Sequence, residues 1–333
     1  MGELDFRKVT IRQDIDSFLQ SVQEPSVVVF SPRSLKNYKI ENKYLTYINY
    51  KDLTKKETNI QSQAKNWQDC AQVIAIGGGS CIDVAQYLST LLNKKFVCIV
   101  TMLSTNAFST NSIIMVQDDN KKRTIKASLA DKIILDTKEI LNAGKMNLFG
   151  LADVLSIYTA CNDWDFAEKC GVEKIDYKIY KQAQNILSEA LALVKNNTQE
   201  DLLISVDKMY DIIGRAGLIT NIYGSGRPES GSEHIFASTL ERYIDIPHGL
   251  AVSIGITLMS IAQGRQSEDI YLALKKLGMY DAIERYNVSD SLIIKVLNEI
   301  APRVDRYTVI DVFDFTPENN QKLINEFRQI VAK

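Results

Sequence analysis

Three consecutive glycines, Gly77–Gly79, are the feature that most restricts the fold of this chain. They follow an apolar run, Gln72–Ile76, that predicts a buried strand. They precede Ile82–Leu92, whose apolar residues repeat at helical spacing, and another apolar run follows at Lys95–Val100. Strand, helix and strand joined by short connections form a right-handed crossover, so the sequence predicts a parallel sheet.

This alternation of strands and helices is confined to the first half of the chain. Further strands are predicted there at residues 26–31, 111–116, 123–127 and 133–136, with a hairpin turn at 118–121. After about residue 146 the apolar spacing predicts helices alone. These are expected at residues 153–158, 178–194, 201–219, 232–240, 251–261 and 293–300. We therefore predict an α/β nucleotide-binding domain over residues 1–146 and an all-helical domain over residues 147–333.

Composition narrows the class of protein further. Among 333 residues, 39 Lys and Arg stand against 41 Asp and Glu, and this net charge of -2 excludes a globally basic nucleic-acid binder. No apolar run approaches the roughly 20 residues that span a bilayer, so no membrane insertion is expected. Five cysteines without a CxxC pair favour reduced thiols and a cytoplasmic location.

The glycine turn is a candidate phosphate-binding loop. Gly78 and Gly79 allow a phosphate close to the backbone, and the helix that they open offers unpaired N–H groups. Asp83 lies in the first helical turn, where an acid suits the helix dipole. A second loop, Thr101–Asn106, follows the next strand at the edge where open α/β sheets bind ligands. Both stretches are also ordinary strand-end turns, and this alternative stays open.

The chain has only two histidines, His234 and His248, and each lies close to a glycine and to an expected helix start. Two imidazoles need a third ligand to form a catalytic zinc-type site, which keeps one position open for substrate. Asp153 is the best candidate because it lies in an apolar segment, where an unpaired carboxylate is costly unless it binds a cation. Separate core or surface histidines are the alternative.

Taken in order, these motifs resemble one superfamily: the iron-containing alcohol dehydrogenase, glycerol dehydrogenase and dehydroquinate synthase group. The stretch Arg227–His234 is similar to the glycerol-1-phosphate branch in particular. The matching stretches are 77–85, 101–106, 150–155, 162–164, 224–234 and 248–249. The resemblance implies a dehydroquinate synthase-like fold, with a Rossmann-like domain that binds NAD(P) and a helical domain that binds metal and substrate.

The resemblance also implies roles for individual residues. Asp153, His234 and His248 become the metal ligands, and Ile157 stands where iron-type enzymes add a histidine. Three protein ligands are similar to the glycerol and glycerol-1-phosphate branches, where zinc is usual, with iron or nickel as alternatives. The implied contacts with NAD or NADP are Gly78, Gly79, Ser80, Asp83, Thr101, Ser104 and Thr110. Arg33 favours NADP, because the preceding strand ends without an acid for the ribose hydroxyl.

Three positions depart from the family pattern. Asn106 stands where the family usually has an Asp that contacts substrate hydroxyls, and Ser238 stands where a second His is common. Gln86 replaces the usual Lys in the helix after the glycines. Asn106, as a catalytic residue, and Ser238 are still the expected substrate contacts, and Arg227 and Lys126 are candidates to bind a substrate phosphate.

These features predict a metal-dependent, NAD(P)-linked oxidoreductase that acts on a secondary hydroxyl of glycerol, glycerol phosphate or a related small polyol. The resemblance also implies a homo-oligomer. Two alternatives stay open. One is a dehydroquinate synthase-like lyase that uses bound NAD transiently to cyclise a sugar phosphate. The other is a catalytically impaired relative that only binds its ligands, which Asn106 and Ser238 suggest.

Overall fold

The computed structural model describes residues 5–34, 40–118 and 122–332. Contacts between residues divide the chain into two compact units. The first consists of Met1–Asn147 with Val206–Ile222, and the second of Leu148–Ser205 with Tyr223–Lys333. Each unit contains its own buried hydrophobic cluster.

A six-stranded sheet in the order β1-β8-β5-β4-β2-β3 forms the first unit, and every neighbouring pair in it is parallel. Its strands are β1 (Thr10–Arg12), β2 (Ser26–Phe30), β3 (Leu45–Asn49), β4 (Gln72–Gly77), β5 (Lys95–Val100) and β8 (Lys132–Leu135). The predicted parallel sheet is confirmed, and β4 with its glycine turn lies between β2 and β5. The edge strands β1 and β3 were not predicted. Their residues are partly or fully exposed, so these strands lack the continuous apolar pattern of a buried strand.

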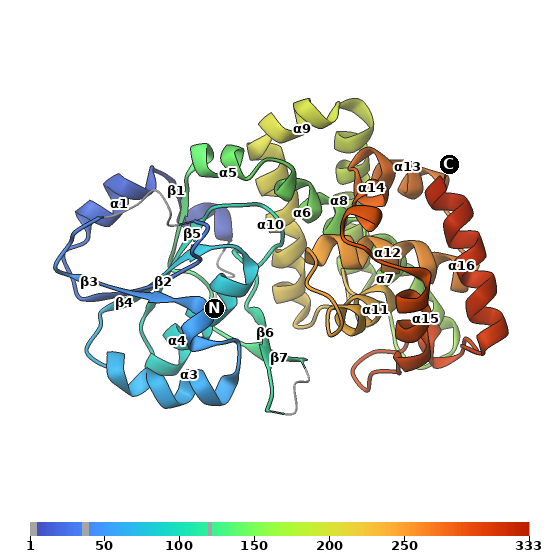
Figure 1. Cartoon of the computed structure of the whole chain (residues 1–333), viewed down its shortest axis with the longest axis horizontal. Helices are drawn as coiled ribbons and strands as arrows, with labels where there is room; N and C mark the ends of the chain where they lie inside the picture. Colours follow the sequence, from blue (N-terminus) through green and yellow to red (C-terminus); the bar gives the residue numbers. More distant parts are fainter. Residues whose placement is uncertain (1–4, 35–39, 119–121, 333) are drawn as a thin grey trace. The chain divides into compact units, whose positions relative to one another are not determined.

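Helices cover both faces of this sheet. Helix α1 (Ile15–Ser21) packs its apolar side chains against one face, which includes Ile74 of β4. Figure 1 shows α1 on one side of the strands, and α3 (Glu57–Ala64) and α4 (Gly79–Leu92) on the other. Because successive strand residues point to opposite faces, burial on both sides explains why the strands read as continuous apolar runs.

Strands β6 (Ser112–Val116) and β7 (Lys122–Lys126) form an antiparallel pair outside the main sheet. This confirms the predicted hairpin strands, whereas residues 119–121 of the predicted turn lie outside the described residues. Short helical segments complete the first unit: η1 (Phe6–Val9), α2 (Tyr50–Leu53), η2 (Lys65–Trp67), α5 (Thr137–Ala143) and η3 (Gly144–Asn147).

A single domain boundary between residues 146 and 147 does not describe the two units fully, because one later segment of the chain returns to the first unit. Helix α10 (Val206–Tyr223) contributes residues 206–222 to the first unit. Its Tyr210 ring stacks on Phe108 with centroids 4.7 Å apart and meets the edge of Phe6 at 5.3 Å. These contacts join residues about 100 and 200 positions apart, which the periodicity of a local stretch cannot reveal.

Helices build the second unit, whose described residues form no strand beyond an isolated bridge between Arg303 and Arg306. They are α6 (Leu148–Val154), α7 (Ile157–Lys169), α8 (Tyr177–Asn196), α9 (Gln199–Ile204), α11 (Ser232–Leu240), α12 (His248–Ala262), α13 (Glu268–Lys276), α14 (Met279–Arg285), α15 (Asp290–Glu299), η4 (Val309–Asp311) and α16 (Pro317–Ala332). The helices predicted at 178–194, 232–240, 251–261 and 293–300 are confirmed.

Two predicted helices are instead divided. The helix expected at 153–158 falls into α6 and α7, and the one expected at 201–219 falls into α9 and α10. A serine lies at each break: the Ser156 hydroxyl donates to the Glu229 carbonyl at 2.6 Å, and the Ser205 hydroxyl donates to the Asp201 carbonyl at 2.7 Å. The Ser205 contact is local, and a serine that bonds to the carbonyl four residues earlier disfavours a continuous helix, whereas the Ser156 contact is to a distant segment.

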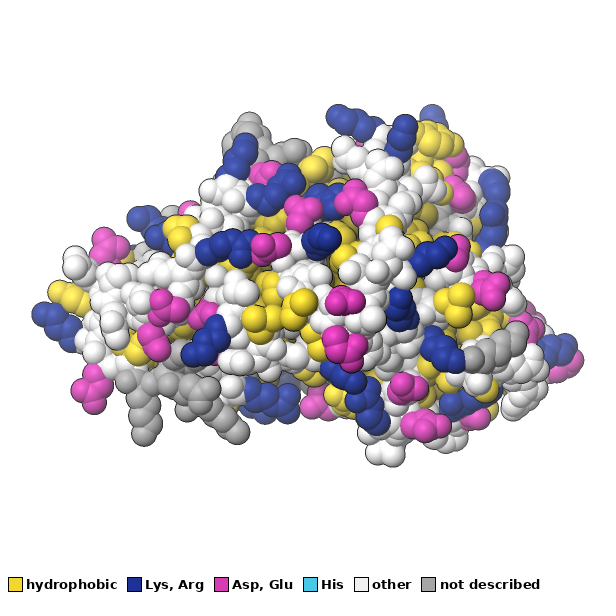
Figure 2. Space-filling view, turned by 90° about the horizontal axis from the view of Figure 1, so that it is seen from above, with side chains coloured by type: hydrophobic (Ala, Val, Ile, Leu, Met, Phe, Trp, Pro, Cys, Tyr) yellow, Lys and Arg dark blue, Asp and Glu magenta, His cyan; other side chains and the backbone are white. Residues whose placement is uncertain are grey.

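The surface agrees with a chain of nearly balanced charge. On the face shown in Figure 2, Lys and Arg side chains are interspersed with Asp and Glu. Within the described residues, none of the helices combines the length and the apolar character needed to cross a bilayer.

Asp136 tests the packing of the first unit. This 5% exposed carboxylate accepts hydrogen bonds from the N–H groups of Ile15, Lys138 and Glu139. Asp136→Asn should lower the free energy of unfolding by about 1–3 kcal/mol, because an amide cannot accept with both of its polar atoms. Asp14→Asn is the matched control, since Asn caps a helix as well as Asp does. Equal melting temperatures for the two variants would contradict the prediction.

Candidate functional site

Asp153, His234 and His248 converge in the second unit. Each offers one ligand atom, and these atoms all lie within 4.8 Å of one another. Asp153 Oδ1 lies 3.4 Å from Nε2 of His234 and 3.8 Å from Nε2 of His248. The three residues come from α6, α11 and α12, so the structure joins positions up to 95 residues apart (248 minus 153).

Each imidazole is held from behind by a carboxylate. His234 Nδ1 lies 2.8 Å from Glu233 Oε1, and His248 Nδ1 lies 2.6 Å from Glu241 Oε1. Such carboxylates fix the ring orientation, which here directs both Nε2 atoms toward Asp153. Glu233 and Glu241 are not among the residues predicted from the sequence. The only available signal was that each lies within seven residues of its histidine.

This group fits a divalent metal. Asp153 Oδ1 is buried and makes no hydrogen bond, and a buried carboxylate oxygen of that kind is costly unless a cation binds it. One carboxylate with two imidazoles matches a catalytic site that leaves a position open for substrate. The donor set thus fits zinc and similar divalent ions.

The electrostatics of the site also favour a cation. Burial by itself would lower the pKa of His234, but its contacts with Asp153 and Glu233 outweigh burial and raise that pKa to about 10. Burial would likewise raise the pKa of Asp153, yet the adjacent His248 and His234 hold it below its usual value. The carboxylates around the two rings therefore stabilise positive charge between them.

Two glycines of α12 allow the three ligand helices to approach. A Cβ on Gly249 would overlap the Phe149 carbonyl of α6, and a Cβ on Gly255 would lie 2.5 Å from the Glu233 carbonyl of α11. Since backbone atoms cannot move aside as a flexible side chain can, both positions require glycine. The ligand distances in this site thus follow from close backbone packing.

Two further positions that the sequence singled out, Ile157 and Ser238, lie close in sequence to the ligands but differ in their exposure. Asp153 is the penultimate residue of α6, and Ile157 begins α7 with no exposed surface, so Ile157 belongs to the core. Ser238 follows His234 by one turn of α11, is partly exposed, and therefore shares the helix face of His234.

The predicted phosphate loop lies in the first unit, at the carboxyl end of β4. Helix α4 begins at Gly79, and its first turn has no side-chain cap. A Cβ on Gly78 would lie 3.0 Å from Met102 Sδ, and one on Gly79 would lie 2.8 Å from Thr105 Oγ1. The glycines therefore bring the two predicted loops together around uncapped N–H groups, an arrangement that fits a phosphate.

The other predicted cofactor contacts differ in accessibility. Ser80 is exposed and Ser104 is partly exposed, whereas Thr101 and Thr110 are buried. The Thr101 hydroxyl lies 3.1 Å from the Ser34 hydroxyl. The buried side chain of Asp83 forms an ion pair with Lys55 at 2.5 Å. The contacts of Thr101 and Asp83 are thus with other protein side chains, and the cofactor roles of all five residues stay predictions.

The predicted substrate residues also have protein partners. The Asn106 carbonyl accepts from the N–H and the hydroxyl of Ser109. Lys126 Nζ donates to Asn111 and Ser112. Arg227 is only 2% exposed and pairs with Glu173 at 3.0 Å. The structure thus places Arg227 in an interior network, and phosphate binding by Arg227 or Lys126 stays a prediction.

Comparison with known proteins agrees with this fold. A family model described as iron-containing alcohol dehydrogenase matches residues 24–143. The glycerol-1-phosphate dehydrogenase (NAD(P)+) of Sulfurisphaera tokodaii is 28% identical over 303 residues, which cover 90% of this chain and 85% of that protein. The enzyme of the same name from Sulfolobus acidocaldarius is 29% identical over 307 residues, with the same coverages of 90% and 85%. These similarities support a relationship to the iron-containing alcohol dehydrogenase-like superfamily.

A solved structure is similar in fold to this chain. The probable glycerol dehydrogenase from Sinorhizobium meliloti superposes with a TM-score of 0.71 over 97% of each chain, at 14% sequence identity. Identity this low shows the fold alone.

Gly249 provides a test of how the site is assembled. Gly249→Ala should destabilise the protein by about 1–3 kcal/mol, because the added Cβ overlaps the Phe149 carbonyl. It should also weaken metal binding by roughly tenfold or more, because α12 carries His248. Gly226→Ala is the control, since its Cβ would meet nothing nearer than 3.6 Å. Thermal unfolding and chelator competition measure both effects, and wild-type values for Gly249→Ala would refute this role of the glycine.

Proposed function

We propose that this chain is a metal-dependent, NAD(P)-linked dehydrogenase that acts on a secondary hydroxyl of a small polyol or polyol phosphate. The single observation that supports it most is the group of Asp153, His234 and His248 around an unpaired carboxylate oxygen. Relatives named glycerol-1-phosphate dehydrogenase, which align over 90% of the chain, make glycerol phosphate the first substrate to test.

The three ligands would hold a divalent ion, zinc by preference. When bound, this ion supplies Lewis acidity that lowers the pKa of a substrate hydroxyl. Glu233 and Glu241 keep both imidazoles in the orientation that binding requires. Ser238, on the same helix face as His234, is the proposed contact for the rest of the substrate.

The first unit would hold the dinucleotide. The N–H groups at the start of α4 and the glycines before it would bind the diphosphate, with Ser80 and Ser104 as accessible hydroxyls beside them. A dinucleotide held there would supply the hydride chemistry of the reaction. Asn106 is the proposed substrate contact from this unit, and its backbone is fixed by Ser109. The homo-oligomer and the cytoplasmic location stay predictions.

Metal analysis combined with a substrate screen tests the proposal. The purified protein should contain about one divalent ion per chain. It should oxidise glycerol 1-phosphate or glycerol, or reduce dihydroxyacetone phosphate, with NAD or NADP. His234→Ala should lose the metal and the activity together, because it removes one of three ligands, whereas Ser238→Ala should keep the metal.

Specific outcomes would contradict this function. Wild-type metal content in His234→Ala would refute the ligand assignment. A nicotinamide cofactor that stays bound and is not consumed would favour the lyase. Tight cofactor binding without turnover of any substrate would favour a ligand-binding relative.

Arg33 tests the choice of cofactor. It is exposed and follows β2, and no acid precedes it at the end of that strand. Arg33→Ala should raise the KM for NADP several-fold, because the variant loses a charged partner for the 2′-phosphate. The KM for NAD is the internal control and should stay unchanged. An equal change in both KM values would show that Arg33 does not distinguish the two cofactors.

A further inference from the structure

Asp163 of α7 is a buried carboxylate that joins four segments of the second unit. Its Oδ2 accepts from the Ser232 N–H at 2.7 Å. Its Oδ1 accepts from the Val309 N–H at 2.9 Å and from the Gln263 amide at 2.8 Å. The side chain has no exposed surface, and burial together with the nearby Glu233 raises its pKa to about 6. Stability alone is a weak reason to bury such a group, since an apolar side chain would avoid its desolvation cost.

The contact with Ser232 is made at the start of the helix that carries His234. Helix α11 begins at Ser232, and its N-cap, Gly231, offers no side chain to the first N–H groups. Two carboxylates accept from these groups instead, since Asp163 accepts from Ser232 and Glu233 Oε1 accepts from the Gly231 N–H at 2.6 Å. The same Glu233 oxygen lies 2.8 Å from His234 Nδ1. Asp163 is therefore linked to the imidazole through the short backbone segment 231–233 and the Glu233 carboxylate.

The loop before α11 is closely packed against its neighbours. A Cβ on Gly231 would lie 2.5 Å from Asp163 Oδ2 and 3.0 Å from the Ala160 Cα. One residue earlier, Arg306 Nη1 donates to both the carbonyl and the hydroxyl of Ser230, at 2.6 and 2.7 Å. The Ser230–Ser232 backbone is thus held from both sides, by α7 and by the segment that contains Arg306.

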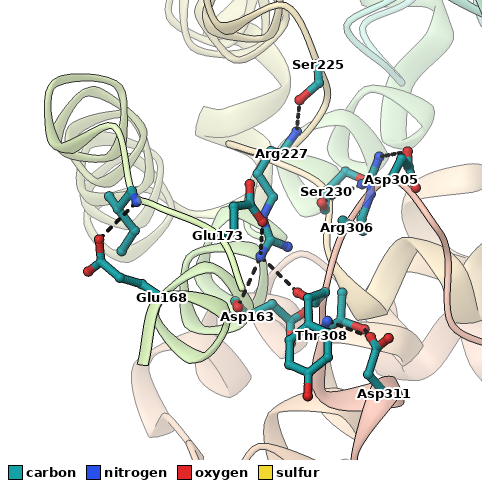
Figure 3. A network of polar contacts seen from close by, with 12 residues as sticks. Asp163, Glu168, Glu173, Ser225, Arg227, Ser230, Asp305, Arg306, Thr308 and Asp311 are labelled. Atoms are coloured by element: carbon teal, nitrogen blue, oxygen red, sulfur yellow. Dashed lines mark hydrogen bonds and ion pairs between the residues drawn. The ribbon is translucent and has the colours of Figure 1, made fainter. Parts of the chain in front are cut away.

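A second arginine secures Asp163 itself. Arg227 Nη2 donates to the Asp163 carbonyl at 3.2 Å and to the Tyr307 carbonyl at 2.9 Å, and it pairs with Glu173 (Figure 3). Figure 3 also shows Arg306 beside Ser230. Both arginine side chains are more than nine-tenths buried, with 3% and 8% of their surface exposed. This network contains Asp163, a residue of the family-like motifs for which no role in ligand binding is given above.

We propose that Asp163 is a positioning residue of the metal centre: it holds the start of α11 so that Glu233 orients His234. This inference rests on the proposed function, because the imidazole is oriented for a metal. A purely structural role would predict lost stability alone. Orientation of a ligand predicts, in addition, an altered metal affinity and an altered ligand field.

Asp163→Asn tests the proposal by metal affinity rather than by turnover. The asparagine amide cannot accept from both Ser232 and Val309, so the Ser232 N–H or the Val309 N–H loses its partner. We expect zinc affinity, measured by chelator competition, to fall about 10- to 100-fold. We also expect the absorption bands of the Co²⁺-substituted protein to shift. The melting temperature of the metal-free protein is recorded in parallel.

Asp136→Asn is the matched control, because Asp136 is also a buried carboxylate that accepts from three N–H groups, but in the first unit. It should lower the melting temperature and leave the zinc affinity and the Co²⁺ spectrum unchanged. If Asp163→Asn also lowers only the melting temperature, Asp163 is structural and the inference is wrong. If Asp163→Asn does not fold, Arg306→Lys is the second test of the inference. This variant keeps the positive charge but loses the two hydrogen bonds to the carbonyl and the hydroxyl of Ser230.

Arg306→Lys should weaken zinc binding several-fold, and wild-type affinity would overturn the inference. If the wild-type protein binds zinc and both variants bind it with the same affinity, only the inference about Asp163 is wrong. A wild-type protein without metal affinity contradicts the proposed function as well.

Discussion

The Asp153 oxygen that lies between two imidazoles without a hydrogen bond is the constraint on which the second unit depends. Such an oxygen is stable there only if positive charge offsets its desolvation. The surrounding structure serves this arrangement: Gly249 and Gly255 let the helices approach, and Glu233 and Glu241 direct both rings. The unit therefore joins close backbone packing to the geometry of a cation site.

In the first unit, too, glycines allow two segments to approach next to a candidate ligand site. Gly78 and Gly79 allow the loops after β4 and β5 to touch, so the uncapped start of α4 lies beside a second polar loop. Gln86, which departs from the family pattern, has a structural role: its amide donates to the carbonyls of Thr110 and Ser128. The glycines of the first unit face side-chain atoms, whereas Gly249 and Gly255 face backbone atoms, and in both units a candidate site lies next to the contact.

Prediction from the sequence succeeded where a local pattern carries the information. Strand β5 has the predicted bounds, and α4 includes the whole predicted helix, because burial leaves a regular apolar repeat. Asp153 could be singled out because an acid in an apolar segment needs a partner. Glu233, Glu241 and Asp163 could not be, because their roles depend on which N–H group or ring nitrogen lies opposite. The ion pair between Arg227 and Glu173 shows the same limit, since no local pattern joins these two positions.

The sequence by itself determined the parallel sheet, the glycine turn at its centre, the helical second half and the three candidate ligands. These depend on residue type and local spacing, which the chain carries in its order. Only the tertiary structure decided that residues 206–222 join the first unit, that Ile157 lies in the core, and that Asp163 supports the loop before His234. The reason is physical: these outcomes are set by contacts between distant segments, whose energies depend on distance and burial rather than on neighbours in sequence.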